Sequence, residues 1–247
     1  MTGARIDTVQ TLNSGDSIAL GAGTDSFSAT LNAGTITPAA ITGVESITFT
    51  ALGAAVVDFD NVSGVTSLTS QGSSATLTVD DIQALATSVT VNNATATNTF
   101  TFKDAAVAGT ADSITVNVSG VSLAAGSQIL IGGEADTDGG IETINVVASN
   151  GASDLGDGGG FGTTATTITV NASAALDLGS AAEFNAVTNF DASASTAGVT
   201  AVFGNRAAAS ETALSFKGGA GADSFDLGAL AIANHGDLTV DMGAGND

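Results

Sequence analysis

Short segments in which polar and apolar residues alternate recur along most of the chain. Each is bounded by Gly, Asn, Asp or Ser, the residues that form tight turns. A period of two is typical of a half-buried β-strand. The clearest segments are TLTV (76–79), SVTV (88–91), TFTF (99–102), SITVNV (113–118), TINVV (143–147) and TITVNA (167–172). The pattern predicts an all-β protein with little helix.

The length of these segments favours one all-β architecture over another. Short strands joined by turns of small and polar residues favour a right-handed parallel β-solenoid or β-roll, in which each turn of the chain stacks on the one before it. The alternative is a series of β-sandwich repeats. Two segments break the pattern: residues 80–87 (DDIQALAT) predict one or two helical turns, and the Gly-rich residues 149–166 predict a linker.

The apolar residues of the chain are mostly small. Hydrophobic residues make up 43% of the sequence, but its aromatic residues are 11 Phe with no Trp or Tyr. Ala, Val, Ile and Leu must therefore fill most of the core, which suits the thin layers of a repetitive fold. The absence of Trp and Tyr also disfavours a carbohydrate site built from aromatic platforms.

The chain is strongly acidic. Its basic residues are Arg5, Lys103, Arg206 and Lys217, against 25 acidic residues, and the formal net charge is -21. We expect no nucleic-acid partner, because phosphates need cations. The acidic residues are 20 Asp and 5 Glu, and Asp is short enough to sit in a turn and offer its carboxylate to a hard cation such as calcium. We favour metal binding over the simpler explanation, which is solubility or adaptation to salt.

Residue types used in catalysis are scarce. The chain has no Cys, a single His (His235) and no GxSxG sequence, so it lacks a thiol nucleophile, a serine elbow and a histidine cluster. Four basic residues are also too few to neutralise the acidic sugar substrate of a lyase or epimerase. We therefore expect a protein that is not an enzyme. We also expect no membrane span, because no apolar run reaches the roughly 18 residues that a span needs.

One Gly-rich segment carries a specific motif. Residues 218–226 read GGAGADSFD and match the nonapeptide GGxGxDxUx of calcium-binding parallel β-rolls in full. In this motif the glycines allow a tight turn whose carbonyl oxygens face a cation, the Asp adds a carboxylate, and an apolar residue begins the next strand. The calcium ligands predicted from this copy are Gly219, Gly221, Asp223 and Asp226.

Two incomplete copies of the motif lie near the ends of the sequence. Leu replaces the first Gly in residues 20–28 (LGAGTDSFS), and Met replaces it in residues 242–247 (MGAGND), where the sequence stops within the motif. Because the same module occurs at both ends, we interpret the chain as one period of a longer array of like domains. The additional predicted ligands are Gly21, Gly23, Asp25, Gly243, Gly245 and Asp247.

A separate acidic segment is a second kind of candidate metal site. Residues 132–140 (GGEADTDGG) together with Glu142 hold four carboxylates, with Asp136 and Asp138 as the central candidate ligands. No EF-hand spacing fits, and an exposed acidic turn is the alternative explanation. There is also an internal echo: residues 41–51 (ITGVESITFTA) and 139–149 (GGIETINVVAS) each place a Glu between a Gly turn and a strand.

These features divide the chain into three predicted segments. Residues 1–60 form an N-terminal β segment with a degenerate motif, and residues 61–215 form the body of the solenoid. Residues 216–247 form a calcium-binding segment that is cut within a motif.

The motifs resemble those of RTX proteins, which are calcium-binding secreted bacterial proteins, and most of all RTX-type surface-layer proteins. The GVESITF and GIETINV units and residues 189–195 (NFDASAS) are similar to surface-layer segments built on β-solenoids. The resemblance implies type I secretion, an extracellular location at the cell surface, and folding and assembly that depend on calcium. Expected partners are calcium ions and either further copies or neighbouring like domains. Cell-surface polysaccharide is a further candidate partner.

Two functions agree with this resemblance. The first is a structural segment of a surface layer or a related extracellular assembly. The alternative is the stalk or a ligand-binding repeat of a large RTX adhesin, with a ligand site on a loop such as residues 149–166. A lattice protein should self-associate when calcium is added, whereas an adhesin repeat should become more rigid and stay monomeric.

Overall fold

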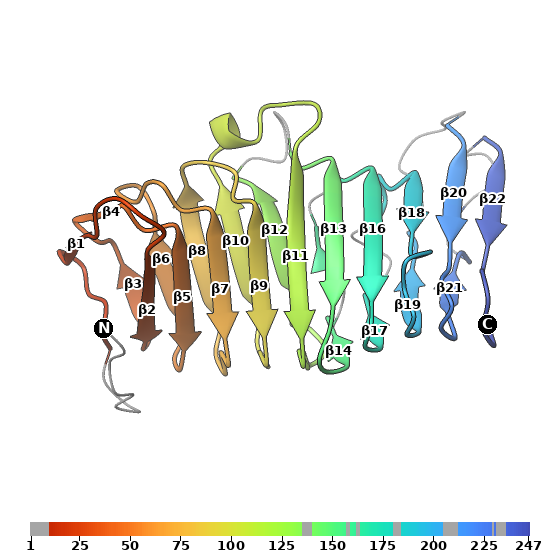
Figure 1. Cartoon of the computed structure of the whole chain (residues 1–247), viewed down its shortest axis with the longest axis horizontal. Helices are drawn as coiled ribbons and strands as arrows, with labels where there is room; N and C mark the ends of the chain where they lie inside the picture. Colours follow the sequence, from red (N-terminus) through yellow and green to blue (C-terminus); the bar gives the residue numbers. More distant parts are fainter. Residues whose placement is uncertain are drawn as a thin grey trace.

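The computed structural model describes residues 10–134, 140–156, 159–161, 164–179, 184–204, 212–228, 230 and 236–247. Within these residues the chain winds into a parallel β-solenoid of about nine turns, which we call rungs (Figure 1). All pairings between the strands are parallel. The all-β solenoid predicted from the strand pattern is confirmed. The alternative of β-sandwich repeats is excluded for the described residues, because their strands pair in parallel with strands of the neighbouring rungs.

One long sheet runs the length of the described chain. It has ten strands, and each strand adds one rung in sequence order. The boundary predicted between residues 215 and 216 falls inside a strand of this sheet. The strands are β2 (Ser26–Leu31), β5 (Ser46–Ala51), β7 (Ser67–Gln71), β9 (Ser88–Asn92), β11 (Ser113–Ser119), β13 (Thr143–Ala148), β16 (Thr167–Ala172), β18 (Asn189–Asp191), β20 (Leu214–Lys217) and β22 (Leu238–Asp241).

Three smaller sheets form the other faces of the solenoid. The six-stranded sheet contains β3 (Gly34–Ile36), β6 (Ala55–Asp58), β8 (Leu77–Ile82), β10 (Asn98–Phe102), β12 (Ile129–Gly133) and β15 (Gly159–Gly160). The four-stranded sheet contains β14 (Ser153–Asp154), β17 (Leu176–Asp177), β19 (Val199–Val202) and β21 (Ser224–Asp226), and the two-stranded sheet contains β1 (Ser17–Ala19) and β4 (Ala40–Thr42). The helix within the described residues is the short 3-10 helix η1 (Asp104–Ala106). The described residues contain no helix with the length and apolar character that crossing a membrane requires.

The core consists of side chains that stack in rows along the solenoid. Alternate residues of each strand point inward, as period two predicts, and the same position of the next rung lies directly above them. One row on the long sheet is no more than 2% exposed at any position. Its members are Ile47, Leu68, Val89, Val116, Val146 and Val170. Aliphatic side chains thus fill layers about 4.8 Å thick.

Toward the C-terminal end, phenylalanines replace part of this aliphatic core. Phe203 is 1% exposed, and its ring centroid lies 4.5 Å from Phe216, 5.2 Å from Phe190 and 5.8 Å from Phe184. Phe225 joins the group with its centroid 5.2 Å from Phe190. Phe225 is the apolar residue of the complete motif, and it lies in β21, the strand that follows the turn, partly buried against the core.

The prediction of helical turns at residues 80–87 is wrong. Strand β8 continues through Asp80 and Asp81 to Ile82, which is 2% exposed and pairs with Phe102. Asp81 has a φ of 58°, and the register between β8 and β10 shifts here. This irregularity adds a residue without turning Ile82 away from the core.

The prediction of a linker at residues 149–166 is also wrong for the part that the structure describes. This segment contains β14 and β15, and Leu155 and Phe161 are fully buried in the core. Its many glycines suggested a linker, but the two large apolar side chains of Leu155 and Phe161 anchor it as a further rung.

Candidate metal sites

Residues 218–223 of the complete motif form the turn between β20 and β21, and residues 224–226 are β21 itself. A Cβ on Gly219 would overlap the carbonyl oxygen of Ser195, in the turn one rung earlier, and a Cβ on Gly221 would overlap the backbone of Ala197. The last copy stacks on the complete one in the same way, since a Cβ on Gly243 or Gly245 would overlap the carbonyl oxygen of Gly219 or Gly221. These glycines therefore let three successive turns stack closely: the turn that contains Ser195 and Ala197, the turn of the complete motif, and the turn of the last copy.

Asp223 of the complete motif is committed to the backbone. It is 3% exposed, its Oδ1 accepts a hydrogen bond from the Val199 N–H at 2.8 Å, and its Oδ2 accepts one from the Gly219 N–H at 2.6 Å. The Asp223 N–H in turn donates to Oδ1 of Asp247 at 2.8 Å. Asp226 is exposed, and its Oδ1 accepts a hydrogen bond from the Gly228 N–H at 2.8 Å. That bond forms an Asx turn at the end of β21.

The N-terminal copy lies at a different corner of the solenoid. Residues 20–25 connect β1 to β2, so this turn leads into the long sheet, whereas the turn at residues 218–223 leads out of it. Gly21 and Gly23 have φ values of 94° and 137°, in the region that favours glycine. Oδ2 of Asp25 is buried and has no hydrogen-bond partner within the described residues. This oxygen faces the turn, because a Cβ on Gly23 would lie 3.6 Å from it.

Glu45 is a residue of this corner that the sequence motifs did not identify. It immediately precedes β5, which pairs with β2, and its Oε2 accepts a hydrogen bond from the Asp25 N–H at 2.8 Å. Glu142 occupies the same position in the other half of the internal echo, where it accepts a hydrogen bond from the Asp112 N–H at 2.8 Å. The echo between residues 41–51 and 139–149 was therefore a signal for a shared corner. It did not show that the Glu side chain reaches back to the preceding rung.

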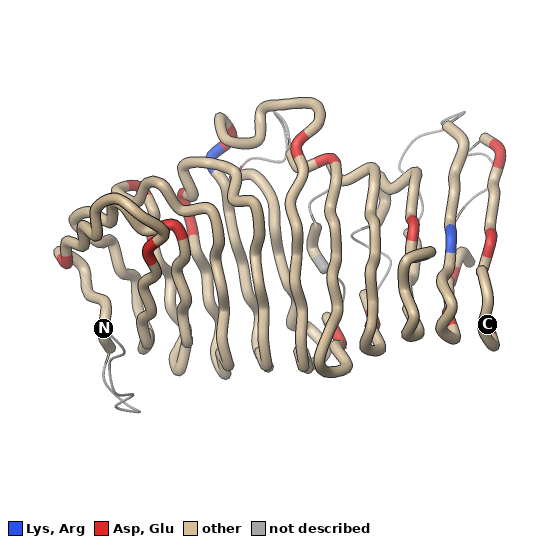
Figure 2. The backbone as a smooth tube through the Cα atoms, in the orientation of Figure 1, with Lys and Arg blue, Asp and Glu red and all other residues tan. Residues whose placement is uncertain are grey.

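A common rule relates these acidic residues. Each carboxylate lies just before a strand or at the matching position of a turn, and accepts a hydrogen bond from the backbone N–H of the residue one rung earlier. Figure 2 shows that most acidic positions lie in turns or at strand ends rather than along the strands. We call Glu45, Glu142, Asp223 and Asp247 the corner carboxylates.

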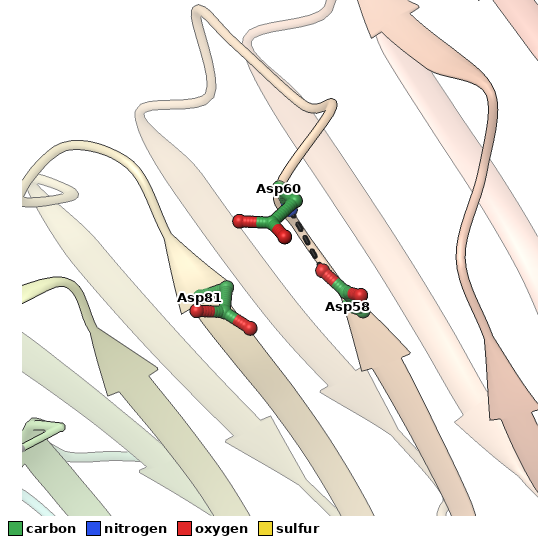
Figure 3. A group of neighbouring side chains, drawn as sticks. All are labelled: Asp58, Asp60 and Asp81. Carbon is green, nitrogen blue, oxygen red and sulfur yellow. Dashed lines mark hydrogen bonds between the residues drawn. The ribbon is translucent and has the colours of Figure 1, made fainter.

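A second acidic group lies at the C-terminal ends of β6 and β8. The carboxylate oxygens of Asp58, Asp60 and Asp81 lie within 4.8 Å of one another (Figure 3), and so do those of Asp80, Asp81 and Glu134. The Asp60 N–H donates to Oδ1 of Asp58 at 2.9 Å. This arrangement has enough carboxylate oxygen to hold a cation.

The cation in this group is a side chain of the protein itself. Nζ of Lys103 lies 3.0 Å from Oδ1 of Asp60 and 3.5 Å from Oε1 of Glu134, and it also contacts Oδ1 of Asp81. Hydrogen bonds to Asp81 and then Asp60 raise the pKa of Lys103. A hydrogen bond with Glu134, followed by the one with Lys103, lowers the pKa of Asp81, and the hydrogen bond with Asp81 raises the pKa of Glu134. We call this group the Lys103 cluster.

The acidic segment at residues 132–140 does not act as one unit within the described residues. Glu134 belongs to the Lys103 cluster, whereas Glu142 is a corner carboxylate bound to Asp112. The two central candidates, Asp136 and Asp138, lie outside the described residues. His235 lies outside them as well.

Of these groups, the N-terminal corner fits a hard cation best. A buried carboxylate oxygen without a partner is costly, and a calcium ion would supply the missing partner. Calcium is bound by six to eight oxygens, from carboxylates, backbone carbonyls and water. Asp25, Glu45 and the carbonyls of the glycine turn provide oxygens of these kinds.

A hollow on the outer face of the four-stranded sheet is a candidate site of another type. It has a volume of about 450 Å³, and its lining includes Ser122, Asp154, Asp177 and Thr200. Asp154 lies within the segment for which the sequence suggested a ligand site.

Comparison with known proteins adds no relative. The chain matches no family model, and it matches neither a curated protein nor a solved structure. The similarity to RTX and surface-layer proteins therefore rests on the motifs themselves.

Proposed function

We propose that this chain is a structural, calcium-binding segment of a secreted bacterial surface-layer protein or a related extracellular assembly protein, and that calcium drives its folding and assembly. The observation that carries the proposal is the buried oxygen of Asp25, which lacks a partner among the residues that the structure describes although it lies in a glycine turn of the RTX type. The stacking of the turns at residues 218–223 and 242–247 supports the expectation that glycine turns repeat along the solenoid.

Charge explains how calcium would control the state of the chain. With a net charge of -21, carboxylates repel one another when calcium is scarce, which opposes the compact state. Bound calcium cancels part of that repulsion, and its binding free energy adds to the folding free energy. At a calcium concentration 100 times the dissociation constant, one site stabilises the folded state by about 2.7 kcal/mol.

A calcium titration tests this function. The purified chain is followed by circular dichroism and light scattering together, with magnesium at equal concentration as the control. Folding that is specific to calcium and accompanied by particle growth is expected for an assembling segment. If calcium changes neither signal, the glycine turns are structural only and the proposed function is wrong.

A second function has an observation of its own. The hollow beside Asp154 and Asp177 gives the segment a concave surface of the kind used for ligands, which favours the stalk or ligand-binding repeat of an adhesin. In that case calcium should rigidify the chain without particle growth. Light scattering therefore separates the two functions, because circular dichroism changes in both.

A further inference from the structure

We infer that the calcium site of this chain lies in the incomplete N-terminal copy of the motif, with Glu45 as its second carboxylate ligand, and that the complete motif at residues 218–226 uses its Asp as a structural cap. This inference rests on the proposed calcium-dependent function. It reverses the ranking that the sequence suggests, because the copy that matches the consensus best is not the one left in need of a cation.

The Lys103 cluster needs no metal ion. Its carboxylates converge on one ammonium group, and three of them lie within ion-pair distance of it. A divalent cation at either set of three carboxylates would share Asp81 with Lys103, so this acidic group is already neutralised in part by the chain.

In the complete motif both oxygens of Asp223 already have a partner. Both oxygens of Asp223 accept backbone hydrogen bonds, one from its own turn and one from the preceding rung. No cation is needed to satisfy these oxygens, because each accepts a hydrogen bond, and a hydrogen bond to a charged acceptor contributes about 1.5–3 kcal/mol. Asp223 therefore caps the N–H groups of Val199 and Gly219 without needing a metal ion.

The N-terminal corner differs from the complete motif in whether the oxygens of its Asp have partners. Oδ2 of Asp25 is buried and has no hydrogen-bond partner within the described residues. The carboxylate of Glu45 is held against the Asp25 N–H, so two negative groups meet at one corner without a described basic partner. A divalent cation would give the buried oxygen of Asp25 a partner and would reduce the repulsion between the carboxylates of Asp25 and Glu45.

The backbone around this corner is shaped for close contact between two rungs. Gly43 has a φ of 63°, and a Cβ there would lie 2.7 Å from the carbonyl oxygen of Gly21. The turn that carries Asp25 is thus pressed against the segment that carries Glu45. A site shared between the two would bind the first rungs together.

The chain contains a matched corner that serves as a control. Glu142 caps the Asp112 N–H at 2.8 Å, as Glu45 caps that of Asp25. Oδ2 of Asp112, however, accepts a hydrogen bond from the Gly109 N–H at 3.0 Å. The two corners share a Glu cap and differ in whether the Asp oxygen is satisfied.

The experiment compares calcium binding to the wild-type chain and four variants by isothermal titration calorimetry. Glu45→Gln keeps an oxygen for the Asp25 N–H but removes the charge, and Asp25→Asn removes the other charge. We expect each to weaken calcium binding at one site by about tenfold or more, because affinity depends on the number of charged ligands. Glu142→Gln and Asp223→Asn should leave the calcium affinity unchanged. In the wild type, calcium should shift the amide NMR signals of residues 21–25 and 43–45.

The outcomes separate this inference from the proposed function. If the wild type binds calcium, Glu45→Gln has no effect and Asp223→Asn abolishes binding, the inference is wrong and the proposed function stands. If the wild type binds no calcium, both fail. Because Asp223→Asn removes one backbone acceptor, its fold is checked by circular dichroism. If it does not fold, Asp226→Asn tests the same motif, and a lost calcium site in that variant also overturns the inference.

Discussion

Replacing Asp223 by Ala should destabilise the C-terminal rungs even when calcium is absent. The side chain is 3% exposed and accepts two hydrogen bonds, so its removal leaves the N–H groups of Val199 and Gly219 without an acceptor. Each buried, unsatisfied N–H costs about 1–3 kcal/mol, which gives a total of about 2–6 kcal/mol. If Asp223 were only a calcium ligand, the metal-free chain would be almost unaffected.

Hydrogen exchange in the presence of a chelator is the suitable assay, because a solenoid can open locally from one end. Exchange at the amides of Val199 and Gly219 should become at least about 30-fold faster, since each 1.4 kcal/mol corresponds to a factor of ten. Asp226→Ala is the matched control. It removes an exposed acceptor of one N–H, so it should change protection by about tenfold or less. Unchanged exchange at Val199 and Gly219 in the Asp223 variant would refute the capping role.

Two further predictions concern stability. Phe203→Ala should lower the free energy of unfolding by about 3–5 kcal/mol, because it leaves a cavity among four neighbouring phenylalanines, and urea denaturation measures the loss. Lys103→Met removes the ammonium that, after the hydrogen bond from Glu134, holds the pKa of Asp81 below its ordinary 3.8. A lowered pKa contributes stability that is present above 3.8 and is lost as the pH falls through the folded-state value. The variant should therefore be less stable than the wild type at neutral pH, with a difference in urea midpoint that narrows at acid pH; an equal difference at every pH would contradict the ion-pair account.

The fold could be predicted from sequence because its strands repeat one simple pattern. Segments such as TITVNA place a small apolar residue at every second position, and the same row then continues in the next rung. The fold predictions were wrong where the local composition favoured a structure other than the strand that continues the row of buried residues. DDIQALAT has residues that favour helix, but Ile82 and Ala86 are required inside the solenoid, and burial outweighs local preference.

The candidate sites were harder to predict, because their geometry depends on which residues meet across rungs. The sequence identified both Asp25 and Asp223 from their glycine contexts and ranked Asp223 first. It could not show that the backbone would satisfy one carboxylate, while the other would have a buried oxygen with no partner in the described part of the chain. Glu45 is 20 residues from Asp25, and the two meet only because that separation equals the length of one rung.

The corner carboxylates also have a direction. In all four cases the N–H belongs to the earlier rung and the carboxylate to the later one. During synthesis from the amino end, a rung at such a corner must therefore wait for its successor before its cap arrives. In a nascent chain the most recently made of these rungs would therefore be the least stable, because its N–H group at the corner has no carboxylate acceptor until the next rung forms.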